Sequence, residues 1–195
     1  MIKVELQKTH PDGYAQIRDA HLAKIQAKEE VKFELANNYR KVLYKQYNNT
    51  CAYLATTFDA EEVRLNRSID HFKPQKACPE CMYDWDNFRL CDGKLNRTFP
   101  DGWPKKGEEV LDPCAEDFDS NWFYLDVATG SYLPSSHVPT DKLDLVSSTC
   151  IYLNKHDYPS WRLRIIWSYL SGLWSKEHIN RFYPGIYYAL TGFPA

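Results

Sequence analysis

Apolar positions along this chain of 195 residues predict helices toward both ends and strands in between. In residues 14–47 apolar side chains recur at helical spacing among charged ones, which predicts one long amphipathic helix or two. The same spacing covers residues 143–153, and a last helical turn or two is expected at 186–190. Residues 161–175 are so rich in aliphatic and aromatic side chains that we expect a helix buried on most sides.

Shorter patterns predict strands elsewhere in the chain. Residues 1–6 alternate between apolar and polar, which is typical of a short strand. Residues 121–125 and 131–133 read as two strands joined by a turn, and therefore predict a small hairpin. In the middle of the chain, residues 68–72 form a short apolar run that contains one polar pair, and we expect a further strand there.

The polar pair in this central strand is Asp70 and His71. Neighbours on a strand point to opposite faces, so the two side chains cannot do the same job. One division of labour is that Asp70 binds a divalent cation while His71 takes a proton from water. The alternative is that the pair closes a hairpin through hydrogen bonds.

A further helical pattern covers residues 87–96, downstream of the predicted strand. Asn87 stands where an N-cap is expected, because its side chain can accept a bond from a first-turn amide. Asn96 would then lie on the helix, where its amide oxygen offers a hard ligand. Asp92 precedes Asn96 by four residues and would share its helix face, so it is an alternative or second ligand.

Charge gives a mixed indication about nucleic acid. The net charge of −2 provides no general attraction to phosphate, which counts against a free-standing nucleic-acid binder. Basic residues nevertheless gather around the polar pair and after the second asparagine: Arg64, Arg67, Lys73, Lys76, Lys94, Arg97, Lys105 and Lys106. These side chains could hold phosphates, or they could form a solvated rim.

The chain has no run of eighteen apolar residues and no signal-peptide pattern, so we expect a soluble, cytoplasmic protein without membrane contact. Six cysteines in that compartment predict thiols rather than disulfides. Cys78 and Cys81 have the C-x-x-C spacing of zinc and redox sites. Two further zinc ligands would have to be Cys51 and Cys91, which are unpaired in the sequence, so we do not expect structural Zn²⁺.

The order of the Asp-His pair, Asn87 and Asn96 resembles the ββα-metal motif of HNH nucleases. A closer likeness rests on four runs: IDHFKP at 69–74, YDWDN at 83–87, RLC at 89–91 and VLDP at 110–113. These runs are similar to the HNH proteins encoded beside an ATPase in Septu-type and retron-linked anti-phage systems. The likeness covers about residues 47–122.

The resemblance implies an α+β protein with a small ββα-metal core at residues 50–113. A strand and helical arm would precede the core at 1–49, and a hairpin with a mainly helical extension would follow at 114–195. The implied site residues are Asp70 and Asn96, with Asp92 as the alternative, as ligands of one Mg²⁺ or Mn²⁺; His71 as general base; Asn87 as the residue that orients the loop; and Lys73, Lys94 and Arg97 as phosphate contacts.

We therefore expect a metal-dependent endonuclease that hydrolyses phosphodiester bonds, with DNA, RNA and tRNA left open as substrates. The implied partner is an SMC- or ABC-like ATPase, joined in retron-linked systems by a reverse transcriptase and its RNA–DNA hybrid. Two alternatives stay open: a catalytically degenerate HNH scaffold that only binds, and an interaction domain stabilised by zinc at Cys78 and Cys81.

Overall fold

A computed structural model of the chain describes residues 1–4, 10–61 and 63–192. The elements in chain order are α1 (Tyr14–Gln26), α2 (Asn37–Gln46), β1 (Arg67–His71), β2 (Phe88–Asp92), α3 (Gly93–Asn96), β3 (Phe123–Asp126), β4 (Ser131–Pro134), α4 (Leu143–Leu153), α5 (Tyr158–Leu170), α6 (Lys176–Phe182) and α7 (Pro184–Thr191). Single 3₁₀ turns lie at Pro79–Cys81, Trp85–Asn87, Ser120–Trp122 and Thr140–Lys142. Two small antiparallel sheets among helices confirm the α+β class.

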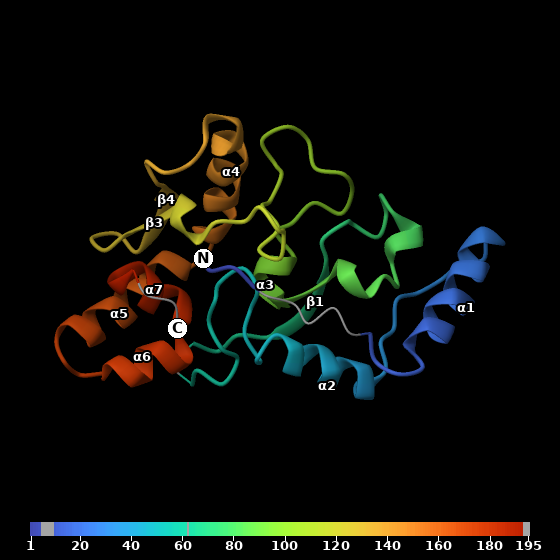
Figure 1. Ribbon diagram of the computed structural model, residues 1–195, viewed down its shortest axis with the longest axis horizontal. Coiled ribbons are helices and arrows are strands. Elements are labelled where there is room, and N and C mark those ends of the chain that lie inside the picture. The colour runs from blue at the N-terminus through green and yellow to red at the C-terminus, as the bar shows by residue number, and fades with distance from the viewer. Residues whose placement is uncertain (5–9, 62, 193–195) are drawn as a thin grey trace.

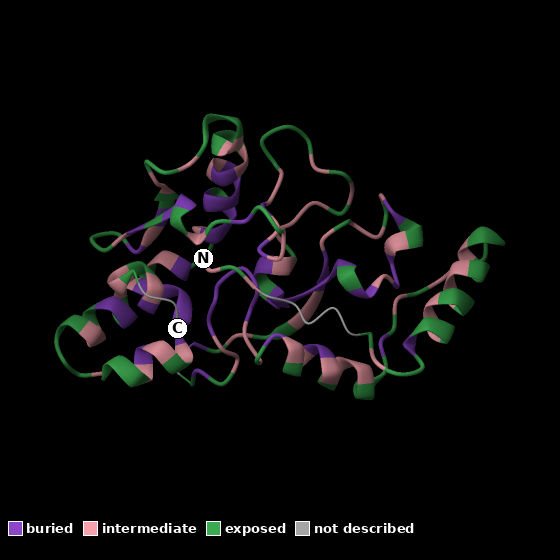
Figure 2. Cartoon of the chain, in the orientation of Figure 1, coloured by how far each residue is buried: buried purple, intermediate pink, exposed green. Residues whose placement is uncertain are grey.

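Figure 1 shows β1 and α3 near the middle of an elongated molecule. Helix α1 extends to one end, and helices α4–α7 gather with the β3–β4 hairpin at the other. Buried residues are concentrated in the middle and in the helical group, whereas α1 is largely exposed (Figure 2). The central sheet therefore lies between two flanking parts of the chain.

Strands β1 and β2 pair antiparallel, with Asp70 opposite Arg89. All five residues of β2 are buried. The edge of the strand that does not pair with β1 is covered as well. There the Ala52 amide donates to the Leu90 carbonyl at 2.8 Å, and the Tyr47 hydroxyl donates to the Phe88 carbonyl at 2.8 Å. The predicted strand at 68–72 is confirmed, and β1 begins and ends one residue earlier than predicted.

The helix predicted over residues 87–96 is wrong in its first half, because residues 88–92 form strand β2. The apolar spacing there misled the prediction, since a strand buried on both faces has no alternation of apolar and polar residues. Only Gly93–Asn96 is helical, and its N-cap is Asp92 rather than Asn87. The order strand, strand, helix is present, with the second strand and the helix shifted along the chain.

The N-terminal arm consists of two helices separated by a non-helical stretch at 27–36. Within α1 only Tyr14 is buried. The strand predicted at 1–6 is wrong for residues 1–4, which are irregular, and its last two residues lie outside the described part of the chain. The Val4 amide instead donates to the Pro113 carbonyl at 2.9 Å.

The C-terminal predictions are largely confirmed, with one correction. The hairpin appears as β3 and β4, and helix α4 has the predicted bounds. Helix α5 is not buried on most sides, because Trp167 and Leu170 are more than 60% exposed, as is Leu173 just beyond it. On α4, Ile151 is exposed as well. In the described residues, no helix combines the length and the hydropathy that crossing a membrane requires.

Candidate active site

A cavity of about 230 Å³ opens at the end of β1 and brings together three of the predicted site residues, Asp70, His71 and Asn96. The two side chains of the polar pair leave the sheet on opposite faces, because they are neighbours on one strand. In the register, Asp70 is paired with Arg89 and His71 with Phe88. Both line the cavity because β1 ends at His71. The central pair and the short helix therefore meet at one polar hollow.

The Asp70 carboxylate is buried, and it is held by a residue that the sequence did not indicate. The Tyr53 hydroxyl donates to Asp70 Oδ2 at 2.7 Å. Burial raises the pKa of Asp70 to about 6, although the Tyr53 hydrogen bond and the Arg89 charge act in the opposite direction. A cation bound at this carboxylate would favour its ionised form.

The His71 ring has a defined tautomer. Its Nε2 lies 2.9 Å from the Met82 carbonyl oxygen, which can only accept, so Nε2 carries the proton. The Gln75 amide nitrogen then donates to Nδ1 at 2.9 Å. Burial lowers the pKa of His71 to about 4, although the bond to Met82 acts in the opposite direction. The ring is therefore neutral near pH 7, with its basic lone pair at Nδ1.

Aromatic packing fixes the plane of this ring. Phe33, from the stretch between α1 and α2, meets His71 edge-on with ring centres 4.4 Å apart. Phe88 approaches it in the same way at 5.2 Å. Helix α1 supports the loop behind the ring, because His21 stacks on Tyr83 with ring centres 3.8 Å apart. The N-terminal arm is therefore part of what positions His71.

Asn87 ties together the two ends of the loop between β1 and β2. Its Oδ1 accepts a bond from the Lys73 amide at 2.6 Å, and its Nδ2 donates to the carbonyls of Lys73 and Cys81 at 3.0 and 3.1 Å. The Cys81 carbonyl immediately precedes Met82, whose own carbonyl holds His71. Through these bonds Asn87 sets the shape of the loop, although it does not itself line the cavity.

Asn96 is anchored through its amide nitrogen. This nitrogen donates to Ser68 Oγ at 2.8 Å and to the Ile69 carbonyl at 3.3 Å. The amide oxygen is therefore the atom that remains to face a cation. Together with Asp70 it offers two hard oxygen ligands in one cavity, which suits Mg²⁺ or Mn²⁺ and leaves coordination positions for water and phosphate.

Asp92 does not share a face with Asn96, which corrects the prediction, and it lies outside the cavity. Its Oδ1 accepts from the Asn66 amide at 2.8 Å, and its Oδ2 accepts from the Tyr158 hydroxyl at 2.5 Å and the Lys94 amide at 3.2 Å. The carboxylate therefore caps α3 and joins it to α5. We no longer propose it as a metal ligand.

The predicted phosphate contacts are only partly placed near the site. Lys73 lines a second cavity next to Asp70, whereas Lys94 and Arg97 line neither of the two. Lys94 faces Asp157 instead, at 3.7 Å. Lys76, noted in the sequence only as part of a basic cluster, lines the polar cavity and pairs with the exposed Asp101 at 2.6 Å.

Cys78 and Cys81 form a disulfide, so the expectation of thiols is wrong for this pair. Their Cα atoms are 5.3 Å apart, which is within reach of a disulfide because the C-x-x-C turn brings them together. With Glu80 they also form a group that could hold a metal ion once reduced. Cys51 and Cys91 are free thiols that share a hydrogen bond in the core, and they do not belong to this group.

Several residues that shape the site carry no sequence signal of their own. Tyr53, Gln75 and Phe33 contact the polar pair from distant or irregular segments. The buried ion pair of Arg89 with Asp112 lies behind Asp70, with two bonds of 2.5 and 2.7 Å. Asp112 belongs to the run VLDP at 110–113, and the structure pairs it with Arg89.

Comparison of the chain with models of protein families and with curated proteins gives no match in either case. The resemblance to HNH nucleases therefore stays a prediction that rests on the motif residues.

Proposed function

We propose that the chain is a metal-dependent HNH endonuclease that hydrolyses phosphodiester bonds in nucleic acid. The observation that carries the proposal is the meeting of Asp70, His71 and Asn96 at one polar cavity. A carboxylate and an amide oxygen for a cation, beside a neutral imidazole, are the groups that this hydrolysis requires. In this proposal, β1, β2 and α3 correspond to the two strands and the helix of the ββα-metal motif.

Asp70 and Asn96 would hold one Mg²⁺ or Mn²⁺ in this mechanism. When bound, such an ion neutralises charge on the scissile phosphate and stabilises the leaving oxygen. His71 accepts the proton of the attacking water at Nδ1, which requires the Gln75 amide to give up its bond to that atom. The Met82 carbonyl keeps Nε2 protonated throughout, and it favours the imidazolium that forms.

Cleavage should depend on a divalent ion and on both proposed ligands. Adding EDTA should stop cleavage by the wild-type chain, and Mg²⁺ or Mn²⁺ should restore it. Asp70→Ala and Asn96→Ala should each raise the metal concentration needed for half-maximal activity by roughly 10- to 100-fold or more. Asp101→Ala is the matched control, because this carboxylate lines the same cavity but pairs with Lys76. An unchanged metal requirement in Asp70→Ala would remove that carboxylate from the ion.

We further propose that the nuclease works in a complex with an ATPase. The net charge of −2 supports this, because phosphate attraction normally supplies much of the affinity for nucleic acid. The exposed apolar side chains Trp167, Leu170 and Leu173 give further support, since they form the outer side of α5 and the turn after it. Apolar side chains gathered in this way are typical of a surface that a partner covers.

Co-expression with the neighbouring gene product should convert a weak lone nuclease into an active complex. Light scattering and cleavage would be compared for the chain alone and for the co-expressed sample. Trp167→Glu should prevent co-purification, whereas Tyr124→Glu, a change at an exposed aromatic residue of β3, should not. A lone monomer that cuts as fast as the co-expressed sample would contradict the proposed dependence on a partner.

A further inference from the structure

A second cavity of about 270 Å³ lies directly beside the polar one. Asp70 and His71 line both cavities, and so do Pro74, Phe99 and Pro100. The two hollows are therefore continuous at the proposed catalytic residues. A ligand bound in the polar cavity would therefore place an adjoining chemical group at the entrance of the second cavity.

The two cavities differ in chemistry. The polar cavity is bordered by Gln75, Lys76 and Asn96, which suit a phosphate and a cation. The second is bordered mainly by aromatic and aliphatic side chains: Tyr53, Phe72, Phe99, Trp103, Pro104 and Val110. A nucleotide has the same division, because it joins a charged phosphate to a flat apolar base.

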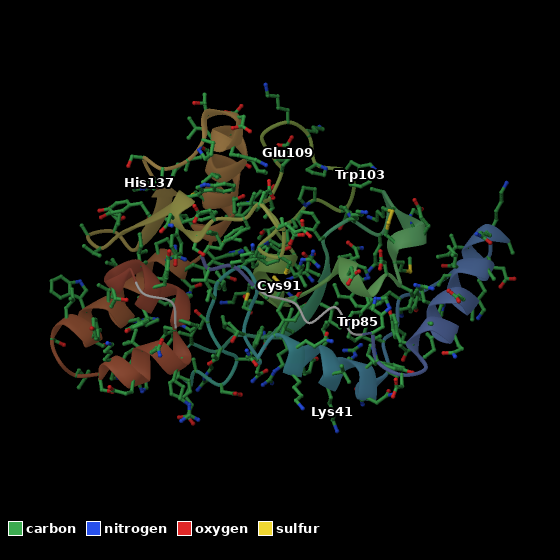
Figure 3. The ribbon with its side chains drawn as sticks, viewed as in Figure 1. Lys41, Trp85, Cys91, Trp103, Glu109 and His137 are labelled. Carbon is green, nitrogen blue, oxygen red and sulfur yellow. A yellow bond between two sulfur atoms is a disulfide. The ribbon has the colours of Figure 1, made fainter. Side chains whose placement is uncertain are left out.

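Trp103 is the most exposed aromatic wall of the second cavity, at 62%. It lies on the segment between α3 and the ion-paired Asp112, which Figure 3 shows carrying both Trp103 and Glu109. Hydrogen bonds hold that segment within itself and to α4, since the Glu109 carboxylate accepts from the Gly107 amide at 2.5 Å and the Glu109 carbonyl accepts from the Ser148 hydroxyl of α4. An ordered loop thus presents an indole face that core packing does not use.

Charge also separates the two cavities. Glu108 and Glu109 border the second cavity and repel phosphate, while Lys73 lies on its side next to β1. Carboxylate oxygens accept hydrogen bonds from the amino and imino groups of bases. A strand would therefore keep its backbone toward the lysines and direct a base toward the glutamates.

We propose that this second cavity binds one unpaired nucleobase, next to the phosphate that is cut, with the base stacked on Trp103. The inference rests on the proposed nuclease function, because it takes the phosphate to lie at Asp70 and His71. A base in an intact duplex has its faces covered by neighbouring pairs, so only a single-stranded or flipped-out base can stack on the indole. The substrate class is therefore single-stranded or locally opened nucleic acid.

Binding of a short fluorescent single strand, as DNA and as RNA, tests the inference by anisotropy in EDTA, where metal-dependent cleavage is blocked. Trp103→Ala should weaken single-strand binding by roughly 5- to 100-fold, and Trp103→Phe should retain most of the affinity. The matched control is Tyr124→Ala, which removes an aromatic side chain of similar exposure from the distant hairpin and should change nothing. The same strand annealed to its complement should bind without dependence on Trp103.

Equal affinities of Trp103→Ala and Tyr124→Ala for the single strand would overturn the base site, as would an absence of measurable single-strand binding. Cleavage assays then separate this failure from failure of the nuclease proposal. If wild type and Trp103→Ala cut the single strand at the same rate, the nuclease stands and the base site falls. If Trp103-dependent binding is found without cleavage in any metal, the binding site stands and the nuclease falls.

Discussion

Replacing His71 with alanine should lower nucleic-acid cleavage by about 10²–10⁴-fold, because the variant lacks the group that takes the proton from water. The neutral ring, fixed by the Met82 carbonyl and the Phe33 ring, supplies that group at Nδ1. Cleavage rates at saturating metal would be compared with those of His137→Ala. His137 lies on the connection between β4 and α4, far from the site, and serves as the matched histidine control (Figure 3).

The ring of His71 is buried, so alanine at this position also leaves a space in the packing. Because the ring packs against Phe33 and Phe88, this space should lower the melting temperature. His71→Gln fills more of that space without restoring a base. Both variants should be assayed well below their melting temperatures. Cleavage at the wild-type rate by either folded variant would show that His71 is not the base.

Replacing Asp112 with alanine should reduce the free energy of unfolding by about 3–5 kcal/mol, because it leaves the Arg89 guanidinium buried without its counter-charge. Burial alone would lower the pKa of Arg89, but the bonds to Asp112 outweigh it and raise that pKa. The remaining acceptors of the guanidinium are the carbonyls of Asp86 and Phe88. Such a loss is a large part of the stability of an ordinary domain.

Urea unfolding measures this effect, and the chain contains its own control. Asp117 and Lys142 form an ion pair of the same length, 2.5 Å, at the surface. Asp117→Ala should therefore change the unfolding midpoint very little, because solvent screens an exposed pair. If the two aspartate variants shift the midpoint equally, the burial of the Arg89 pair does not stabilise the fold as argued.

Local sequence patterns predicted the elements that have a clear spacing of apolar and polar residues. The strand around Asp70, the hairpin of β3 and β4 and helix α4 belong to this group. Strand β2 was missed because both its faces and both its edges are covered, which removes the polar positions that reveal a strand. For helix α5 the error was the reverse: its apolar composition predicted burial on most sides, whereas Trp167 is exposed.

The candidate site divides in the same way. Asp70, His71, Asn87 and Asn96 could be selected because their spacing matched a motif. Their supports could not be selected, since Tyr53 reaches Asp70 across 17 residues and Tyr158 reaches Asp92 across 66. Contacts of that range depend on how the chain packs, and no local pattern encodes them. Asp92 was misassigned for this reason, because its real partner lies in a different element.

Another contact between distant parts of the sequence bears on the order in which the chain folds during synthesis. The last part of the molecule closes against the segment before β1: the Gly185 amide donates to the Ala55 carbonyl at 3.0 Å. A Cβ at Gly185 would lie 2.6 Å from that of Ala55, so the two segments meet at backbone distance. Ribosomes add about 5–20 residues per second, so β1, β2 and α3 leave the ribosome several seconds before α7 does. A growing chain therefore carries every residue of the proposed site several seconds before α7 can close against the segment that precedes β1.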